Sequence, residues 1–216
     1  MFVEVFLFSA GYLIIAMPQS SSTSFQTDVA KASKLSYDQE FVCNRENIKI
    51  WNHSFAGMHM HSDTCTLPSS VLNRWIFSTR RIFKQHVVPD SNNTNIVRQA
   101  LLKGARIVYL SRDPVQSGHA ACERLVAERR KVDITTIERK IDALRLWRAE
   151  WNAVFDNQSV HRVTYNHLRY DNKKNVKDIL NFWNLSFHTF NDSKARLVNH
   201  SSRTCNFTRT RAYPDK

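Results

Sequence analysis

The chain has 216 residues, of which 42% are hydrophobic, so it is long and apolar enough for a folded domain and does not have the composition of a disordered tail. Its 31 Lys and Arg residues exceed its 19 Asp and Glu residues, which gives a formal net charge of +12 and favours an anionic partner such as a nucleotide, a nucleic acid, a membrane surface or an acidic glycan. The four cysteines form no CxxC pair, which argues against a zinc site.

Residues 1–17 are almost wholly apolar and have the length of a signal peptide or a short membrane anchor. No basic residues precede the apolar run, however, and Glu4 interrupts it. We therefore interpret Leu13–Met17 as a buried strand. On this interpretation, membrane association needs an anchor that is N-terminal or missing from the chain.

Short β-branched or apolar runs alternate with helical patterns along the chain. The expected strands are Leu13–Met17, Ala105–Leu110 and Val160–Tyr165, and the expected helices begin near Thr23 and cover Asp133–Phe155 and Val176–Trp183. Strands that alternate with helices indicate an α/β fold. We expect a single domain over residues 1–216, with three α/β/α layers around a central parallel sheet.

A hydroxyl-rich turn follows the first expected strand and leads into a helix. It comprises Gln19, Ser20, Ser21, Ser22, Thr23 and Ser24. Backbone N–H groups and the positive end of the helix dipole attract anions at such a place, and hydroxyl groups add donors. A simple N-terminal cap of the helix is the alternative interpretation.

Two further segments carry cations that could act on an anionic ligand. Lys84 and His86 are two residues apart, so they face the same way in an extended segment. There a neutral imidazole can accept a proton and the lysine can stabilise a developing negative charge, although a solvated basic stretch is the ordinary alternative. Arg112 lies two residues after the Ala105–Leu110 strand, at the edge of a parallel sheet where ligands bind. The alternative interpretation is that Arg112, Asp113 and Pro114 form a plain surface turn.

These segments, in this order and together with Tyr165 at the end of the third strand, resemble the sulfotransferases that use 3′-phosphoadenylyl sulfate (PAPS), a family with a P-loop-type nucleotide-binding fold. Residues 18–24 resemble their 5′-phosphosulfate loop, with Gln19 in place of a Lys and Ser21 in place of a Gly. Ile82 to Pro89 resembles their Lys-x-His-x-Pro stretch, and Arg112-Asp113-Pro114 resembles their 3′-phosphate motif. Ala120 stands where that motif has a Ser.

The resemblance implies transfer of a sulfuryl group to a hydroxyl or amine of an acceptor, which is a glycan, a protein or a small molecule, with no metal required. It implies that His86 is the general base and that Lys84 contacts the sulfuryl group. Residues 19–24 would then bind the 5′-phosphosulfate, Arg112 the 3′-phosphate and Tyr165 the adenine. The degenerate loop keeps a second interpretation open, in which the fold binds nucleotide or acidic glycan with impaired catalysis.

Two other functional classes have weaker support. A nucleotide kinase would need the GxxxxGK[ST] loop, which the chain lacks. A nucleic-acid binder rests on charge alone, without a recognised module, so we expect no nucleic-acid partner.

The compartment is indicated by glycosylation sequons. Seven occur, against about 2.6 expected by chance from the Asn, Ser and Thr content. We therefore expect a glycoprotein of the secretory pathway or Golgi lumen with paired cysteines, and an Asn- and Ser-rich cytoplasmic protein is the alternative.

Overall fold

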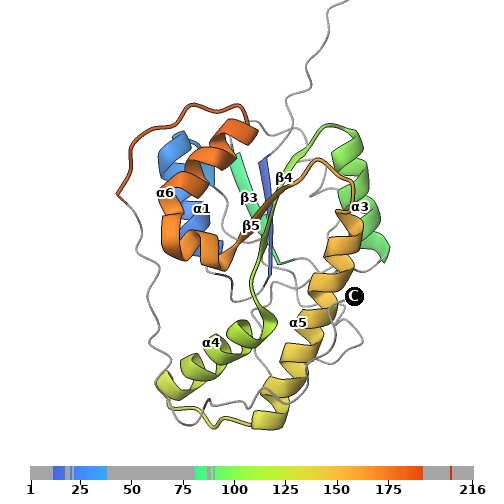
Figure 1. Ribbon diagram of the computed structural model, residues 1–216, viewed down its shortest axis with the longest axis vertical. Helices are drawn as coiled ribbons and strands as arrows, with labels where there is room; N and C mark the ends of the chain where they lie inside the picture. Colours follow the sequence, from blue (N-terminus) through green and yellow to red (C-terminus); the bar gives the residue numbers. More distant parts are fainter. Residues whose placement is uncertain are drawn as a thin grey trace, which may run out of the picture.

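The computed structural model describes residues 12–17, 20, 22–37, 81–86, 89, 91–191 and 205. Its centre is a parallel five-stranded sheet in the order β2-β3-β1-β4-β5 (Figure 1). The strands are β1 (Tyr12–Ala16), β2 (Ser36–Tyr37), β3 (Arg81–Gln85), β4 (Arg106–Ser111) and β5 (His161–Thr164). The helices are α1 (Ser22–Ser33), α3 (Ser91–Leu102), α4 (Pro114–Ala127), α5 (Ile134–Val154) and α6 (Tyr165–Phe182).

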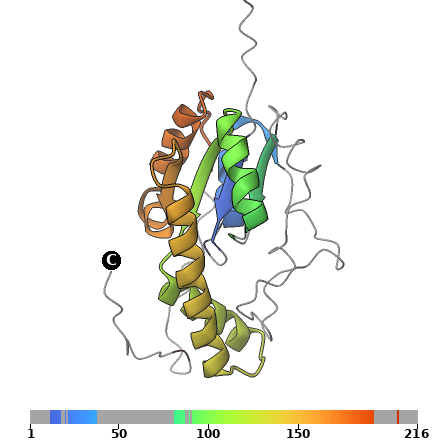
Figure 2. The same cartoon turned by 90° about the vertical axis from the view of Figure 1, so that its right-hand side faces the viewer.

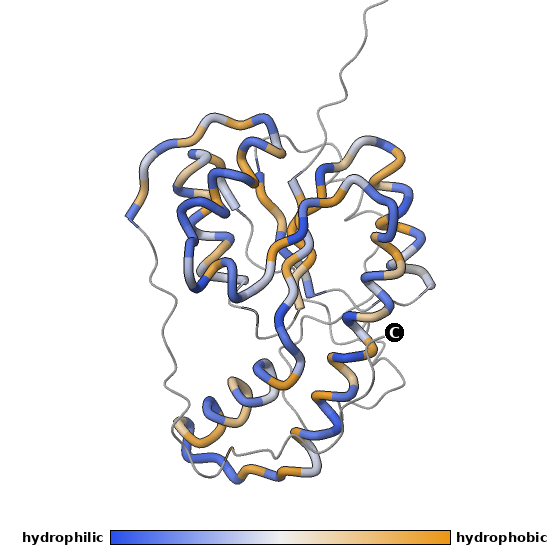
Figure 3. The backbone as a smooth tube through the Cα atoms, in the orientation of Figure 1, coloured by the Kyte–Doolittle hydropathy of each residue, from blue (hydrophilic) through white to orange (hydrophobic). Residues whose placement is uncertain are grey.

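Helices cover both faces of the sheet, α1 and α6 on one face and α3 and α5 on the other (Figure 1). Alternate residues of β1 explain this arrangement, since Ile14 packs with α1 and α6 while Leu13 and Ile15 pack with α3 and α5. The hydrophobic residues accordingly concentrate along the central strands (Figure 3). The expected three-layer α/β/α fold with a parallel sheet is confirmed.

The three strands expected from the sequence are present, each within one residue of its expected bounds. The sequence did not indicate β2 and β3 as strands. β2 has only two residues, and Lys84 and Gln85 interrupt the apolar pattern of β3. The parallel register Ile14↔Lys84 nevertheless places Lys84 beside the centre of β1. The pairing with β1 therefore determines that this polar residue is part of a strand.

The longest expected helix is confirmed as α5, whose N-cap is Asp133 and whose C-cap is Phe155. Its apolar face supplies Trp147 and Trp151, which are at most 1% exposed. The expected helix Val176–Trp183 is only the second half of α6. The helix begins at Tyr165 and is interrupted at Asp171, which has non-helical backbone angles.

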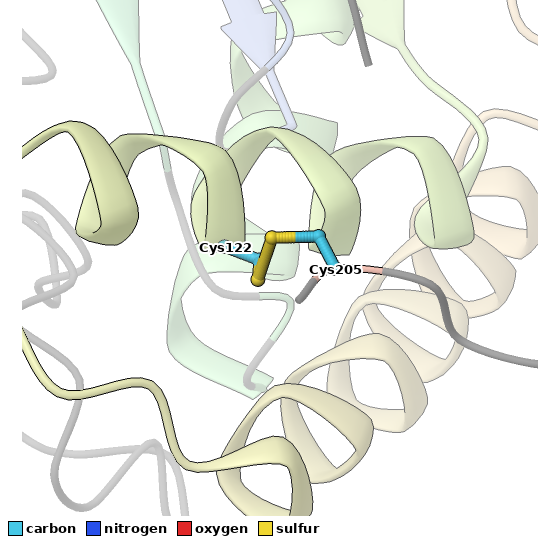
Figure 4. The surroundings of a disulfide bond; sticks show 2 residues. All are labelled: Cys122 and Cys205. Carbon is cyan, nitrogen blue, oxygen red and sulfur yellow. A yellow bond between two sulfur atoms is a disulfide. The ribbon is translucent and has the colours of Figure 1, made fainter. Parts of the chain in front are cut away.

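Helices α4 and α5 form a hairpin that extends beyond the carboxyl edge of the sheet (Figures 1 and 2). The helices approach closely at Gly118, where an added Cβ would lie 2.5 Å from the side chain of Ile141. A disulfide joins Cys122 of α4 to Cys205 (Figure 4). This bond confirms pairing for two of the cysteines, while Cys43 and Cys65 lie outside the described residues.

None of the helices in the described ranges combines the length and the hydropathy that a membrane span requires.

Candidate functional site

The residues singled out in the sequence gather at the carboxyl edge of the sheet. Strands β1 and β4 end side by side, and the N–H of Met17, directly after β1, donates to the carbonyl of Leu110 in β4 at 2.8 Å. His86 follows the end of β3 and Arg112 follows the end of β4. The edge therefore brings together groups that are far apart in the chain. Ser22 and His86, for example, are separated by 64 residues.

The hydroxyl-rich turn leads into α1, which begins at Ser22, one residue before its expected start. Ser22 is buried, whereas Thr23 and Ser24 are exposed in the first turn. The hydroxyl of Ser20 is fully buried and has no hydrogen-bond partner within the described part of the chain. Because a buried hydroxyl without a partner is costly, this group fits a loop that binds an anion. Gln19 and Ser21 lie outside the described residues.

Lys84 and His86 both contact the first turn of α1, as expected from their spacing. The Nζ of Lys84 donates to Oγ1 of Thr23 at 2.9 Å. His86 contacts Ser22 through Nε2 at 3.4 Å and the carbonyl of Ala16 through Nδ1 at 2.7 Å. The expectation that the two side chains share a face of the strand is therefore confirmed.

The contacts of His86 define its tautomer. A carbonyl oxygen only accepts hydrogen bonds, so Nδ1 carries the proton that it donates to Ala16. The lone pair of Nε2 is then directed at the hydroxyl of Ser22, which donates to it. This is the form in which an imidazole can accept a proton from a substrate.

Burial weakens both groups as bases. It lowers the pKa of His86 to about 4, and the nearby charge of Lys84 contributes to the same shift. Burial also lowers the pKa of Lys84 to about 8. The imidazole is therefore neutral near pH 7, and the lysine is largely charged at that pH and half-charged near pH 8.

The second part of the site lies across β4 and β5. The parallel register pairs Ser111 with Thr164, so the next residues, Arg112 and Tyr165, are neighbours. The guanidinium carbon of Arg112 lies 3.8 Å from the centroid of the Tyr165 ring. Arg112 is 6% exposed and Tyr165 is 8% exposed. Cation–π attraction explains why a buried guanidinium adopts this position.

Asp113, the neighbour of Arg112, caps α4. Its carboxylate accepts a hydrogen bond from the N–H of Gln116 at 2.9 Å, and Pro114 occupies the start of the helix. The Arg-Asp-Pro sequence is therefore a strand-to-helix junction, and not the plain surface turn that was its alternative. Ala120 lies on α4 where a second hydroxyl was expected by resemblance, and the nearby hydroxyl of Ser117 is buried without a hydrogen-bond partner among the described residues.

One cation of this part of the site, Arg169, was not predicted from the sequence. Arg169 lies one turn after Tyr165 on α6, and its charge lowers the pKa of Arg112 along with burial, which is the larger cause. The signal in the sequence was the spacing of four residues between Tyr165 and Arg169, which places the two side chains on the same face of a helix. Two guanidinium groups near one another favour an anion between or beside them.

The described residues contain no group of three or more His, Cys, Asp or Glu side chains arranged to hold a metal ion. What the arrangement offers is a helix N-terminus with hydroxyl groups, a buried lysine, a neutral imidazole and a stacked guanidinium. These groups suit a ligand that carries phosphate or sulfate groups.

Residues 91–189 match the model of a family described as the sulfotransferase family. The matched residues include Arg112 and Tyr165, whereas Ser22, Lys84 and His86 precede them. No curated protein matches the chain.

Among solved structures, a sulfotransferase from Alicyclobacillus acidocaldarius is similar, with a TM-score of 0.58 and 14% sequence identity. The similarity covers 82% of this chain and 81% of that chain. At this identity the likeness concerns the fold.

Proposed function

We propose that the chain transfers a sulfuryl group from PAPS to a hydroxyl or amine of an acceptor, with a carbohydrate as one candidate. The match of residues 91–189 to the sulfotransferase family model and the likeness of the fold to a sulfotransferase structure support this. One observation carries the proposal: Lys84 and His86 converge on the first turn of α1 at the same sheet edge as Arg112. Residues 19–24 would bind the 5′-phosphosulfate, and Arg112 would bind the 3′-phosphate.

In the proposed reaction, the acceptor oxygen attacks the sulfur atom while its proton passes to Nε2 of His86. An O–S bond forms to the acceptor, the bond between the sulfur and the phosphate oxygen breaks, and adenosine 3′,5′-bisphosphate leaves. The hydrogen bond from Nδ1 to Ala16 fixes the tautomer that this step needs. The acceptor hydroxyl would replace Ser22 as the donor to Nε2.

Lys84 would stabilise the charge on the transferring and departing oxygens. The bound anion would also raise the pKa of Lys84 and of His86, because negative charge favours the protonated form of each. This change opposes the effect of burial on both groups. The imidazole would thus become a stronger base when the co-substrate is present.

The proposal is tested by calorimetry with adenosine 3′,5′-bisphosphate, followed by transfer of labelled sulfate from PAPS to a panel of glycan, peptide and phenol acceptors. We expect the wild type to bind the nucleotide. We expect the same of Arg98→Ala, which removes an exposed positive charge on α3 and is the control for the site variant Arg112→Ala. Absence of binding by the wild type would contradict the proposal.

A second candidate function is binding of nucleotide or acidic glycan with impaired catalysis. It is favoured by Ala120, which cannot donate the second hydrogen bond to a 3′-phosphate, and by Gln19, which carries no charge. Gln19→Lys separates the two candidates, since a cation at this loop should raise turnover in an enzyme. A wild type that binds nucleotide without transfer, and that Gln19→Lys does not rescue, would favour the second candidate.

We further propose that the protein resides in the secretory pathway. The Cys122–Cys205 disulfide supports this, because such bonds persist in oxidising compartments. The sequon residues Asn157, Asn184 and Asn191 are exposed, as glycosylation requires. A glycosidase-dependent mass shift after expression in a secretory host would test the proposal, and no shift would favour the cytoplasm.

A further inference from the structure

The contact between Arg112 and Tyr165 bears on what Tyr165 does. Tyr165 is 8% exposed, and the guanidinium carbon lies 3.8 Å from the centroid of its ring. A purine stacks on an aromatic ring only where a full face of that ring is accessible. Little of the Tyr165 ring is left for such a contact, because Arg112 covers one face and the ring as a whole is buried.

The backbone also favours a pairing of these two residues. Ser111 and Thr164 are register partners in adjacent parallel strands. Helix α6 begins directly after Thr164, and α4 begins at Pro114, after Arg112 and Asp113. Thr164 caps α6 by accepting a hydrogen bond from the N–H of His167 at 3.3 Å, which fixes where the helix begins. The first residue of α6 is therefore held beside the junction that carries Arg112.

Arg112 is buried, and two charged groups act on it besides the ring of Tyr165. Burial lowers the pKa of Arg112, and the carboxylate of Asp113, which also caps α4, opposes this shift. The charge of Arg169 on α6 also lies near. A long arginine side chain has many rotamers, and a planar aromatic surface restricts them to one in which the fork of donors lies in a fixed plane.

We propose that Tyr165 is a positioning residue for Arg112, whose guanidinium it holds in the orientation that binds the 3′-phosphate of the nucleotide. This inference rests on the proposed function and assigns the ring a different partner from the adenine. It predicts that loss of the Tyr165 ring weakens the binding of the 3′-phosphate and has little effect on the binding of the rest of the nucleotide.

Two ligands distinguish the roles: adenosine 3′,5′-bisphosphate and adenosine 5′-phosphate, which share the adenine and the 5′-phosphate. We expect Tyr165→Leu to weaken binding of the bisphosphate about 10- to 30-fold, the loss of a desolvated cation–π contact, and to change binding of the monophosphate less than about twofold. Tyr165→Phe keeps the ring and should restore most of the affinity. With Arg112→Ala already present, Tyr165→Leu should cause no further loss.

Equal weakening for both ligands would overturn the inference and identify an adenine contact, and unchanged affinity for both would also overturn it. In either case the bisphosphate still binds to the wild type, so the proposed function stands. If the wild type binds neither nucleotide, the proposed function fails and the inference fails with it. Tyr165→Met fills the volume without a ring and serves as the second variant if Tyr165→Leu does not fold, with the same outcomes required.

Discussion

On the β3 and β1 side of the sheet edge, Lys84 and His86 reach α1 through hydrogen bonds, whereas on the β4 and β5 side the guanidinium of Arg112 lies over the ring of Tyr165. Burial acts differently in the two places. It lowers the pKa of His86 to about 4 and that of Lys84 to about 8, so their charge depends on pH and on what is bound. Burial also lowers the pKa of Arg112, but a guanidinium remains charged at any pH that leaves the protein folded.

The difference suggests a division of labour. The first region has groups that can exchange a proton, and the second has a permanent charge in a fixed plane. We therefore expect substitutions in the first region to affect turnover and pH dependence, and substitutions in the second to affect affinity.

The largest effect is expected for His86→Ala. Loss of the general base should lower sulfate transfer by roughly 10²–10⁴-fold. Affinity for adenosine 3′,5′-bisphosphate should stay nearly unchanged, since the imidazole is neutral near pH 7. Single-turnover transfer and calorimetry measure the two effects, and a parallel loss of both would contradict the division.

The next effect concerns acid stability. His86 has a pKa of about 4 in the folded protein, below its ordinary value of 6.5, so the unfolded chain binds more protons between these pH values. Stability should therefore fall as the pH decreases from about 6.5 to 4, by up to about 3 kcal/mol from this group at roughly 1.4 kcal/mol per pH unit.

His86→Gln is the matched variant, since an amide can donate to Ala16 without titrating. Urea unfolding across this pH range should show a weaker pH dependence for His86→Gln than for the wild type. Identical slopes would show that His86 is not the group responsible.

In the second region, Arg112→Ala should weaken binding of adenosine 3′,5′-bisphosphate by about 1.5–3 kcal/mol, the usual contribution of a charged hydrogen bond. Because arginine stays charged, the difference from the wild type should be the same at about pH 7.5 and about pH 9, a range in which both phosphate groups of the ligand are almost fully ionised. Calorimetry at both pH values tests this, and equal affinity in wild type and variant would remove Arg112 from the site.

The smallest effect is expected for proton uptake at Lys84. At pH 8 about half of the molecules carry a neutral Lys84, and an anion beside it should raise its pKa, so binding should take up as much as about half a proton. Calorimetry in buffers of different ionisation enthalpy measures this quantity. Lys84→Met should abolish the uptake, and an unchanged uptake would assign it to another group.

Much of the fold could be predicted from the sequence because the central strands are continuous apolar runs. Ile14, Ile107 and Val108 are fully buried, and such runs indicate parallel strands covered on both faces. Helix α3 and strand β3 were not predicted, since the first half of α3 is polar and Lys84 breaks the pattern of β3. Their structure depends on neighbours that the local pattern does not contain.

The residues of the candidate site could be proposed from the sequence, but most of the contacts between them could not. The spacing of Lys84 and His86 predicted that they share a face, which is correct. The stacking of Arg112 on Tyr165 follows from the register of β4 and β5, and register depends on sheet pairing that a single sequence does not reveal. Proton positions on His86 likewise depend on the carbonyl of Ala16, 70 residues away in the chain.

The Cys122–Cys205 bond also constrains the order of events during biosynthesis. Cys205 leaves the ribosome 83 residues after Cys122, which corresponds to a delay of roughly 4–17 s at ordinary rates of translation. By then the strands and helices up to α6 have emerged and Cys122 can already be packed between α4 and α5. The covalent link can therefore close on a helical hairpin that has had time to form.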